Sequence, residues 1–274
     1  MTEKRLDKVL IDRKLVSSRV RAQQIIEESG VLVNGKLITK TGKSVPEDAE
    51  IQLISEEIPW VSKGALKLLA AIEHWKISCR DKSFIDLGAS TGGFTDFTLQ
   101  HGAKKVLALD VGKGQLHYKL QHDSRVVNLE GINFRNFSLE DLIRVLDDVS
   151  LEKKTKDYKE HFMAAESNYS HRLDFIVSDL SFISLTKVAD KILEIAKHFN
   201  PRIVLLLKPQ FEASKEIADK FRGIITDEKI RDEIIKDLLE KLSMSGLQLK
   251  EMIESPIKGT KGNVEYLAEF GVLR

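Results

Sequence analysis

Two lysines and two acids, far apart along the 274-residue chain, each stand beside apolar sequence. They are Lys67 in SKGALKL, Asp179 in SDLSFIS, Lys208 in LLLKPQFE and Glu265 in GNVEYLAEF. A lysine taken singly is usually exposed to solvent, but four such charges would be costly to bury unless they met. We therefore expect them to converge. A lysine amine can act as a general base when burial and a neighbouring cation lower its pKa.

The stretch FIDLGASTGGFTD at 84–96 is a candidate ligand site, because its glycines let the backbone approach a ligand closely. A phosphate loop would need a lysine and a hydroxyl residue after its glycines, whereas here Phe94 follows Gly93. The spacing also departs from the G-x-G-x-x-G pattern of dinucleotide sites. Asp86 would repel a diphosphate but could bind an ammonium group, and Asp110 could accept hydrogen bonds from ribose hydroxyls. A ribose, an amino-acid end and no phosphate describe S-adenosylmethionine.

The candidate residues for this cofactor come from the glycine turn and from the ends of later apolar runs. We predict them to be Asp86, Gly88, Ser90, Thr91, Gly92, Gly93, Phe94, Asp110, Val111, Asn133, Asp179 and Phe182. The plainer alternative for Asp86 is that it only caps the turn that follows. No metal is expected, because the methyl donor is already activated as a sulfonium and a single cysteine, Cys79, cannot build a cysteine metal site.

Most of these residues follow short apolar runs, which we predict to be strands at 83–87, 105–109, 126–129, 174–178 and 202–207. Helix-like stretches lie between most of the runs, and this alternation predicts a mostly parallel sheet covered on both faces. In such sheets, ligands bind beyond the carboxyl ends of the strands, near the switch in strand order. Two late runs, 247–253 and 264–272, are expected to pair as a terminal hairpin.

The start of the chain carries a strong local charge. Residues 4–21, KRLDKVLIDRKLVSSRVR, hold seven bases and two acids, which gives +5 in a protein whose net charge is +1. Apolar spacing predicts two helices, the second beginning after Ser17 or Ser18. A hairpin that turns at Asn34-Gly35 and a short strand at 50–54 should follow. The plain alternative to a nucleic-acid surface is a pair of solvated amphipathic helices.

Composition limits the class of protein. With 42% apolar residues the chain can bury a real core, and no segment approaches the ~18 uninterrupted apolar residues of a membrane span. The N-terminus has no apolar signal-peptide core, and the single cysteine leaves no internal disulfide, so we expect a soluble cytoplasmic protein. Nothing in the sequence indicates an oligomer, and a monomer is our expectation.

These motifs resemble known families. RLDKVL, SSRVRAQQII and SGVLVNGK resemble the S4 RNA-binding fold over about residues 3–54. DLGASTGGFTD, ALDVGKGQL, SDLSFISL, KPQFEA and GNVEY resemble the FtsJ-type ribose 2′-O-methyltransferases, and the two domains together resemble the TlyA (hemolysin A) family over nearly the whole chain. The resemblance implies an α/β protein: a Rossmann-like, seven-stranded methyltransferase sheet with a small N-terminal S4-like α+β domain.

The resemblance also implies an activity, namely methyl transfer from S-adenosylmethionine to the 2′-hydroxyl of cytidine in ribosomal RNA. The family's lysine–aspartate–lysine–glutamate set falls on the four residues described first. Lys208 is then the candidate base and Lys67 the neighbouring cation, with Asp179 and Glu265 orienting the two amines. Phosphate contacts to structured RNA would come from Arg5, Lys8, Arg13, Lys14, Arg19 and Arg21.

We predict an S4-like domain at 1–55, a linker at 56–62 and a methyltransferase domain at 63–274. Ile58 stands in the linker where members of the family carry arginine, so a relay of RNA binding through the linker is an open question. Residues 150–171 are expected to be a charged insertion, folded as a solvated helix or loop.

Two other classes of protein are alternatives to a methyltransferase. One is a non-catalytic RNA-binding or ribosome-assembly factor, against which the intact set of four argues. The other is a cytolysin, which no long apolar or amphipathic segment supports.

Overall fold

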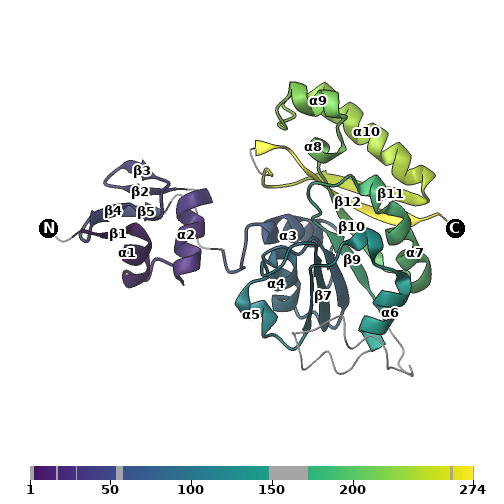
Figure 1. Cartoon of the computed structure of the whole chain (residues 1–274), viewed down its shortest axis with the longest axis horizontal. Coiled ribbons are helices and arrows are strands. Elements are labelled where there is room, and N and C mark those ends of the chain that lie inside the picture. Colours follow the sequence, from purple (N-terminus) through teal and green to yellow (C-terminus); the bar gives the residue numbers. More distant parts are fainter. Residues whose placement is uncertain are drawn as a thin grey trace. The chain divides into compact units, whose positions relative to one another are not determined.

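The computed structural model describes residues 3–16, 18–28, 30–53, 58–147, 172–259 and 262–273. The chain divides into two compact units, Met1–Val61 and Ser62–Arg274 (Figure 1). The charged insertion expected at 150–171 lies outside the described residues. Among the described helices, none combines the length and the apolar composition that crossing a bilayer requires.

The N-terminal unit contains the two helices and the hairpin expected from its sequence. Helices α1 (Leu6–Asp12) and α2 (Arg19–Glu28) pack together, and strands β2 (Val31–Val33), β3 (Lys36–Ile38) and β5 (Ile51–Leu53) form a sheet of order β3-β2-β5. Asn34 and Gly35 both have positive φ, 48° and 74°, as a tight hairpin turn requires. The sequence did not reveal the pair β1 (Glu3–Arg5) and β4 (Ser44–Pro46), because this pairing joins residues far apart along the chain and no turn motif marks it.

The C-terminal unit is built on a seven-stranded sheet of order β11-β12-β10-β9-β6-β7-β8. Its strands are β6 (Ser83–Leu87), β7 (Lys105–Asp110), β8 (Val126–Glu130), β9 (Phe175–Ser178), β10 (Arg202–Leu207), β11 (Leu247–Glu254) and β12 (Tyr266–Val272). Strands β6 to β10 are mutually parallel, whereas β12 runs antiparallel to both β10 and β11. The five predicted strands, the mostly parallel sheet and the terminal hairpin are therefore confirmed.

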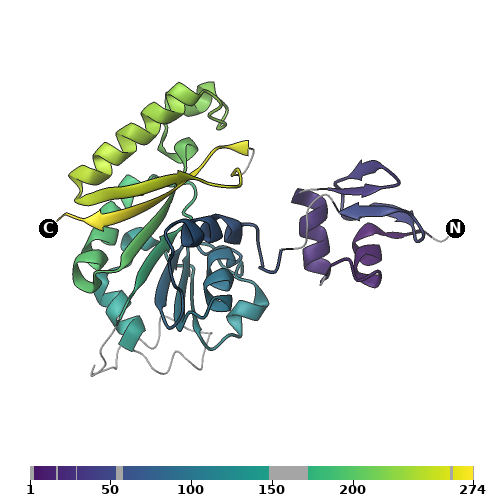
Figure 2. The same ribbon diagram turned by 180° about the vertical axis from the view of Figure 1, so that it is seen from behind.

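Helices cover both faces of this sheet, with α7 nearer the viewer in Figure 1 and α3 nearer in Figure 2. The helices of the unit are α3 (Gly64–His74), α4 (Gly93–Gln100), α5 (Tyr118–Gln121), α6 (Leu139–Asp147), α7 (Ala189–Phe199), α8 (Pro209–Glu212), α9 (Lys215–Lys220) and α10 (Glu228–Met244). Short 3-10 helices occupy Phe134–Asn136 and Leu185–Lys187. Mainly apolar strands with helices on both sides are what a buried, mostly parallel sheet requires.

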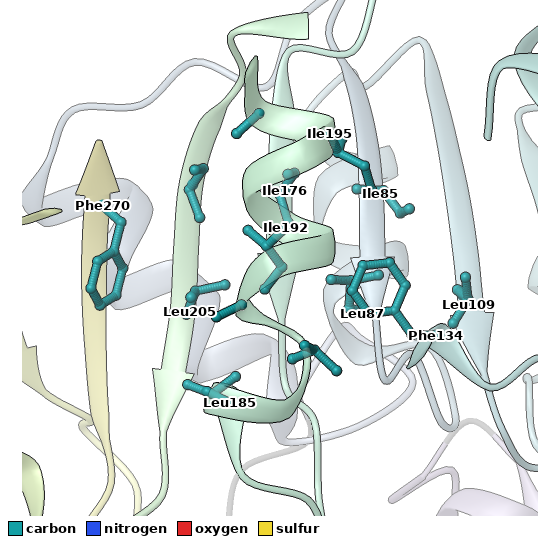
Figure 3. Packing of buried hydrophobic residues seen from close by; sticks show 14 of the residues in the cluster. Ile85, Leu87, Leu109, Phe134, Ile176, Leu185, Ile192, Ile195, Leu205 and Phe270 are labelled. Carbon is teal, nitrogen blue, oxygen red and sulfur yellow. The ribbon is translucent and has the colours of Figure 1, made fainter. Parts of the chain in front are cut away.

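Side chains of strand β6 alternate between the two faces of the sheet and have a different role on each face. Ile85 and Leu87 of β6 belong to the cluster that also holds Ile192 and Ile195 of α7, as Figure 3 shows. Successive strand residues point to opposite sides, so Phe84 and Asp86 face the other layer. Asp86 is thereby directed toward α4, where it is hydrogen-bonded to Thr95. One strand thus supplies both core packing and a buried carboxylate.

The strand order changes direction at β6, which lies between β9 and β7. The chain builds β6, β7 and β8 outward on one side and then returns to place β9 and β10 on the other. Ligand sites in open parallel sheets form at such a switch, outside the carboxyl ends of the strands. The glycine turn follows β6 and Asp179 follows β9, so both begin at the switch.

Candidate active site

The four candidate residues converge on one cluster. The Lys67 Nζ atom lies 2.8 Å from Oε2 of Glu265 and 3.3 Å from Oδ2 of Asp179, and the Lys208 Nζ atom lies 2.5 Å from Oδ1 of Asp179. Asp179 therefore bridges the two lysines. Three members of the cluster are buried, since Lys67, Lys208 and Glu265 are only 8%, 6% and 2% exposed, whereas the Asp179 side chain is 21% exposed.

Strand directions explain why these distant residues meet. Asp179 and Lys208 follow the carboxyl ends of the parallel strands β9 and β10. Glu265 immediately precedes β12, which is antiparallel to β10 and pairs Tyr266 with Leu207, so Glu265 arrives at the same edge. Lys67 comes from the buried face of α3, beside Leu68. The antiparallel strand β12 thus starts at the edge of the sheet where the parallel strands β9 and β10 end.

The two lysines differ in their surroundings. Burial by itself lowers the pKa of Lys67, but the carboxylates of Asp179 and Glu265 more than offset this effect, and the net pKa is raised. Lys67 is therefore a fixed cation. Besides the Asp179 carboxylate, Lys208 donates to the backbone oxygen of Asp179 at 3.3 Å and to the Ser181 hydroxyl at 2.7 Å. Its Nζ atom thus has a hydroxyl partner before any substrate is present.

The glycine turn packs directly against this cluster. Gly88 and Gly92 have φ values of 85° and 94°, in the left-handed region that other residues adopt only with strain. A Cβ atom on Gly88 would lie 3.0 Å from the backbone oxygen of Asp179, and one on Gly93 would lie 2.3 Å from Oγ of Ser62. All three glycines are thus required by conformation or by close approach. The predicted cofactor turn and the four charged residues form one continuous site.

Asp86 is a buried carboxylate with one uncommitted oxygen. Its Oδ2 atom accepts a hydrogen bond from the Thr95 hydroxyl at 2.7 Å, whereas Oδ1 is buried and has no partner among the described residues. Burial raises its pKa to about 7, although the hydrogen bonds from Thr95 act in the opposite direction. Capping α4 through Thr95 accounts for only one of the two oxygens. Buried polar atoms without partners are rare in folded proteins, so this oxygen is free to accept a hydrogen bond from a ligand or an ordered water.

Asp110 holds the loops beyond β6 and β7 together. Its two oxygens accept hydrogen bonds from the backbone N–H groups of Ser90, at 2.9 Å, and Gly112, at 2.7 Å. The Asn133 side chain accepts from the Arg135 backbone N–H at 3.1 Å, beyond β8. Val111 is exposed next to Asp110. These predicted cofactor residues thus follow neighbouring strands β6, β7 and β8.

Phe182 packs against Phe211, which lies next to Lys208. Its side chain is 90% exposed, and its φ of 61° is unusual for a bulky residue. The ring centroid lies 5.0 Å from that of Phe211, which in turn lies 5.6 Å from the Lys208 Nζ atom. The sequence predicted Phe182 as a cofactor contact, but missed Ser181, Gln210 and Phe211. Each of the three stands two or three residues from Asp179 or Lys208, which is the signal that could have found them.

Two of the predicted RNA contacts have a shared partner inside the N-terminal unit. Arg5 donates two hydrogen bonds of 3.0 Å to the fully buried Asp7, and Arg19 donates one of 3.1 Å. The hydrogen bond from Arg5 is the largest of the effects that lower the pKa of Asp7 to about 2. Both guanidinium groups remain about half exposed, so Asp7 orients them without removing them from solvent.

Arg13 binds backbone oxygens of the same unit, those of Glu47 and Ala49. Its guanidinium group therefore has a structural role that the sequence did not indicate. Lys8 and Lys14 are exposed. Arg21 belongs to α2, but its side chain is outside those that the structure describes.

The strand order, the glycine turn at the switch and the lysine–carboxylate cluster define an α/β methyltransferase. Comparison with known proteins agrees: the model of the FtsJ-like methyltransferases matches residues 60–271, and that of the S4 domain matches residues 4–51. The chain belongs to the TlyA (hemolysin A) family, in which an S4 domain accompanies an FtsJ-like methyltransferase domain.

Individual relatives match over nearly the full length. The chain is 38% identical over 266 residues to hemolysin A of Brachyspira hyodysenteriae, covering 97% of this chain and 99% of the relative. It is 33% identical over 263 residues to the 16S/23S rRNA (cytidine-2′-O)-methyltransferase TlyA of Mycobacterium tuberculosis, covering 96% and 87%. A solved structure of a candidate hemolysin from Streptococcus thermophilus superposes with a TM-score of 0.67 at 32% identity, covering 99% of this chain and 89% of that one.

Proposed function

We propose that this protein transfers a methyl group from S-adenosylmethionine to the ribose 2′-hydroxyl of cytidine in ribosomal RNA. The observation that carries the proposal is the buried Lys67–Asp179–Lys208–Glu265 cluster, packed against the glycine turn. Cytidine and ribosomal RNA are the acceptor for which the Mycobacterium tuberculosis relative is named. We further propose that the protein acts as a monomer on ribosomal subunits in the cytoplasm.

The residues at the glycine turn fit S-adenosylmethionine. The partnerless Oδ1 atom of Asp86 can accept a hydrogen bond from the ammonium group, and each Asp110 oxygen retains a lone pair for a ribose hydroxyl. Gly88, Gly92 and Gly93 leave the backbone open to close approach. The bound cofactor would supply a methyl group already activated on a sulfonium.

Lys67 and Lys208 would have different roles toward the acceptor hydroxyl group. Lys67 is kept protonated by two carboxylates, so it can hold the 2′-oxygen and stabilise the negative charge that develops there. Lys208 would accept the proton that the 2′-hydroxyl group loses during the transfer. Asp179 is within 2.5 Å and would keep the Lys208 amine pointed at the acceptor. The Ser181 hydroxyl, now 2.7 Å from Lys208, lies where a substrate hydroxyl would compete.

Two features support an RNA acceptor. The exposed ring of Phe182, predicted above as a cofactor contact, also offers a face on which an unstacked nucleobase can stack beside Lys208. Arg5 and Arg19 present half-exposed guanidinium groups oriented by Asp7, and Lys8 and Lys14 are exposed nearby in sequence. Such groups bind phosphates without reading sequence.

Transfer of tritiated methyl groups tests the proposed function. The purified protein, S-adenosylmethionine and unmethylated ribosomal subunits should yield labelled RNA, with the label resistant to chemistry that cleaves at free 2′-hydroxyls. Mapping the modified nucleotide should then identify cytidine. Label on a base would contradict the proposal. Cofactor binding without any transfer would favour the assembly factor, and lysis of red cells without cofactor binding would favour the cytolysin.

Cofactor binding should depend on pH through Asp86. Its pKa is raised to about 7, so below that pH an ammonium group must displace a proton from the carboxyl group. The affinity for S-adenosylmethionine should therefore rise by up to about tenfold per pH unit between roughly pH 5.5 and 7, and then level off. Calorimetry should show weaker and nearly pH-independent binding for Asp86→Asn. An equal slope in the variant would remove Asp86 from the cofactor site.

The same carboxyl group should affect stability in the opposite sense. Its pKa is higher in the folded chain than in the unfolded chain, so the folded state holds the proton more tightly. Stability contributed by this proton is present at low pH and is lost as the pH rises from ~4 to ~7. Without ligand, Asp86→Asn should therefore flatten the pH dependence of thermal unfolding. This measurement separates the titration of Asp86 from any effect on binding.

A further inference from the structure

The carboxylate of Glu265 is held at both oxygens. Its Oε2 atom accepts from Lys67 at 2.8 Å, and its Oε1 atom accepts from the side-chain amide Nε2 of Gln210 at 3.0 Å. On the same side stands Gly259, where an added Cβ atom would lie 1.9 Å from Oε1 and 2.4 Å from Cδ of Glu265. The amide and the glycine thus define where Oε1 can be.

We propose that Gln210 and Gly259 are positioning residues, which fix the orientation of the Glu265 carboxylate and, through it, the Lys67 ammonium group. This inference rests on the proposed methyl transfer, in which Lys67 holds the acceptor oxygen. Neither residue reaches the reacting atoms in this role. A carboxylate bound at one oxygen only could rotate, and Lys67 would then be offered to the acceptor in several positions rather than one.

The position of Gln210 follows from the end of β10. Lys208 is the first residue after the strand, and Pro209 opens the short helix α8, so the chain turns at once. Gln210 is thereby delivered to the edge where β12 begins, next to Glu265. The KPQ sequence therefore supplies two parts of the site: the candidate base itself, and a donor to the acid on the neighbouring strand.

Hydrogen bonds anchor the backbone at Gly259. Its backbone N–H donates to the oxygen of Asn263 at 2.8 Å. The buried Asn263 side chain accepts from the Ile225 N–H and donates to the Gly223 oxygen, both at 2.9 Å, which anchors this loop to a separate turn. The φ of Gly259 is not in the left-handed region, so alanine is compatible with the backbone. The added methyl group would displace the Glu265 carboxylate instead.

The other end of the Gln210 amide bears on the stability of the fold. Its Oε1 atom is buried without a hydrogen-bond partner among the residues that the structure describes. An unsatisfied buried oxygen destabilises a fold, and an apolar side chain of the same length would avoid that penalty. The same change also removes the donor to Oε1 of the buried Glu265, so Gln210→Met has two opposing effects on the unfolding temperature. The unfolding temperature measures the balance of these two structural effects, and kcat tests the positioning role.

The test uses the full-length protein and three variants in the methyl-transfer assay. Gln210→Met and Gly259→Ala should each lower kcat by about 10- to 100-fold, while KM for RNA and for S-adenosylmethionine changes by less than about twofold. Gln248→Met is the matched control, because Gln248 is exposed on the edge strand β11. It should retain wild-type kcat. Thermal unfolding of every variant reports whether the fold has changed.

A double-mutant cycle tests whether Gln210 affects kcat through Glu265. In a Glu265→Ala background there is no carboxylate to orient, so adding Gln210→Met should change kcat by less than about twofold. Full kcat in Gln210→Met and Gly259→Ala would overturn the inference, and so would an equal loss of kcat with and without Glu265. If the wild-type protein transfers no methyl group to RNA, the proposed function fails as well. If the wild-type protein is active and Gln210→Met and Gly259→Ala are equally active, only the positioning role is contradicted.

Discussion

Replacing Lys208 by alanine should abolish methyl transfer while the protein still folds and binds S-adenosylmethionine. The change removes the candidate base, and positioned general bases contribute roughly 10²–10⁴-fold to rate. Asp179 does not lose its charge partner, because its other oxygen remains 3.3 Å from Lys67. The cofactor candidates Asp86 and Asp110 are held by Thr95 and by the backbone N–H groups of Ser90 and Gly112, so their geometry should persist without the Lys208 side chain.

Single-turnover methyl transfer measures this loss separately from product release, and calorimetry measures cofactor binding. Lys197→Ala is a suitable control, since Lys197 is exposed on α7 away from the cluster. Turnover at the wild-type rate in Lys208→Ala would exclude Lys208 as the base. Loss of cofactor binding together with activity would indicate a structural role for Lys208 in the turn.

Replacing Asp179 by asparagine should have an effect of similar size for a different reason. This carboxylate is the only one within ion-pair distance of Lys208 among the described residues, and it also pairs with Lys67. The amide has nearly the same shape but no charge, so both lysines would lose a carboxylate partner. One of the two carboxylates that raise the pKa of Lys67 would also be lost. We expect kcat to fall by roughly 10²-fold or more, because both amines lose their orientation.

Thermal unfolding accompanies this measurement, because removing one partner from a largely buried ion pair also destabilises a protein. Asp190→Asn provides the matched control, as Asp190 is exposed in the first turn of α7. If Asp179→Asn retains wild-type kcat, the bridge between the lysines has no part in the reaction. If kcat falls only in proportion to the unfolded fraction, its role is confined to stability.

Much of the fold could be predicted from local patterns. The runs at 83–87 and 202–207 are nearly continuous in apolar residues, and buried parallel strands require such runs, so β6 and β10 begin and end where expected. The Asn34-Gly35 pair predicted its hairpin because both residues tolerate positive φ. The pair β1–β4 was missed, since its pairing depends on residues about forty positions apart rather than on local sequence.

The candidate site divides in the same way. The sequence by itself determined which chemical groups are present: the glycines that permit the turn, the acid before it, and two lysines and two acids beside apolar runs. We expected those four groups to converge because burying unpaired charges is energetically unfavourable. Their catalytic roles came from the resemblance to the FtsJ-type family. Arg13 illustrates the limit, because its charge predicted an RNA contact and its position gave it backbone partners at Glu47 and Ala49.

Only the tertiary structure decided which groups meet. Asp179 bridges both lysines, and Glu265 reaches Lys67 across 198 positions of sequence, because β12 runs antiparallel beside β10 and begins where β10 ends. The contacts of Gln210 and Gly259 with Glu265 depend on the same pairing register of β10 and β12. Hydrogen bonds act over about 3 Å, whereas sequence patterns report only the near neighbours of each residue, so the partner of a buried charge is set by strand direction and register.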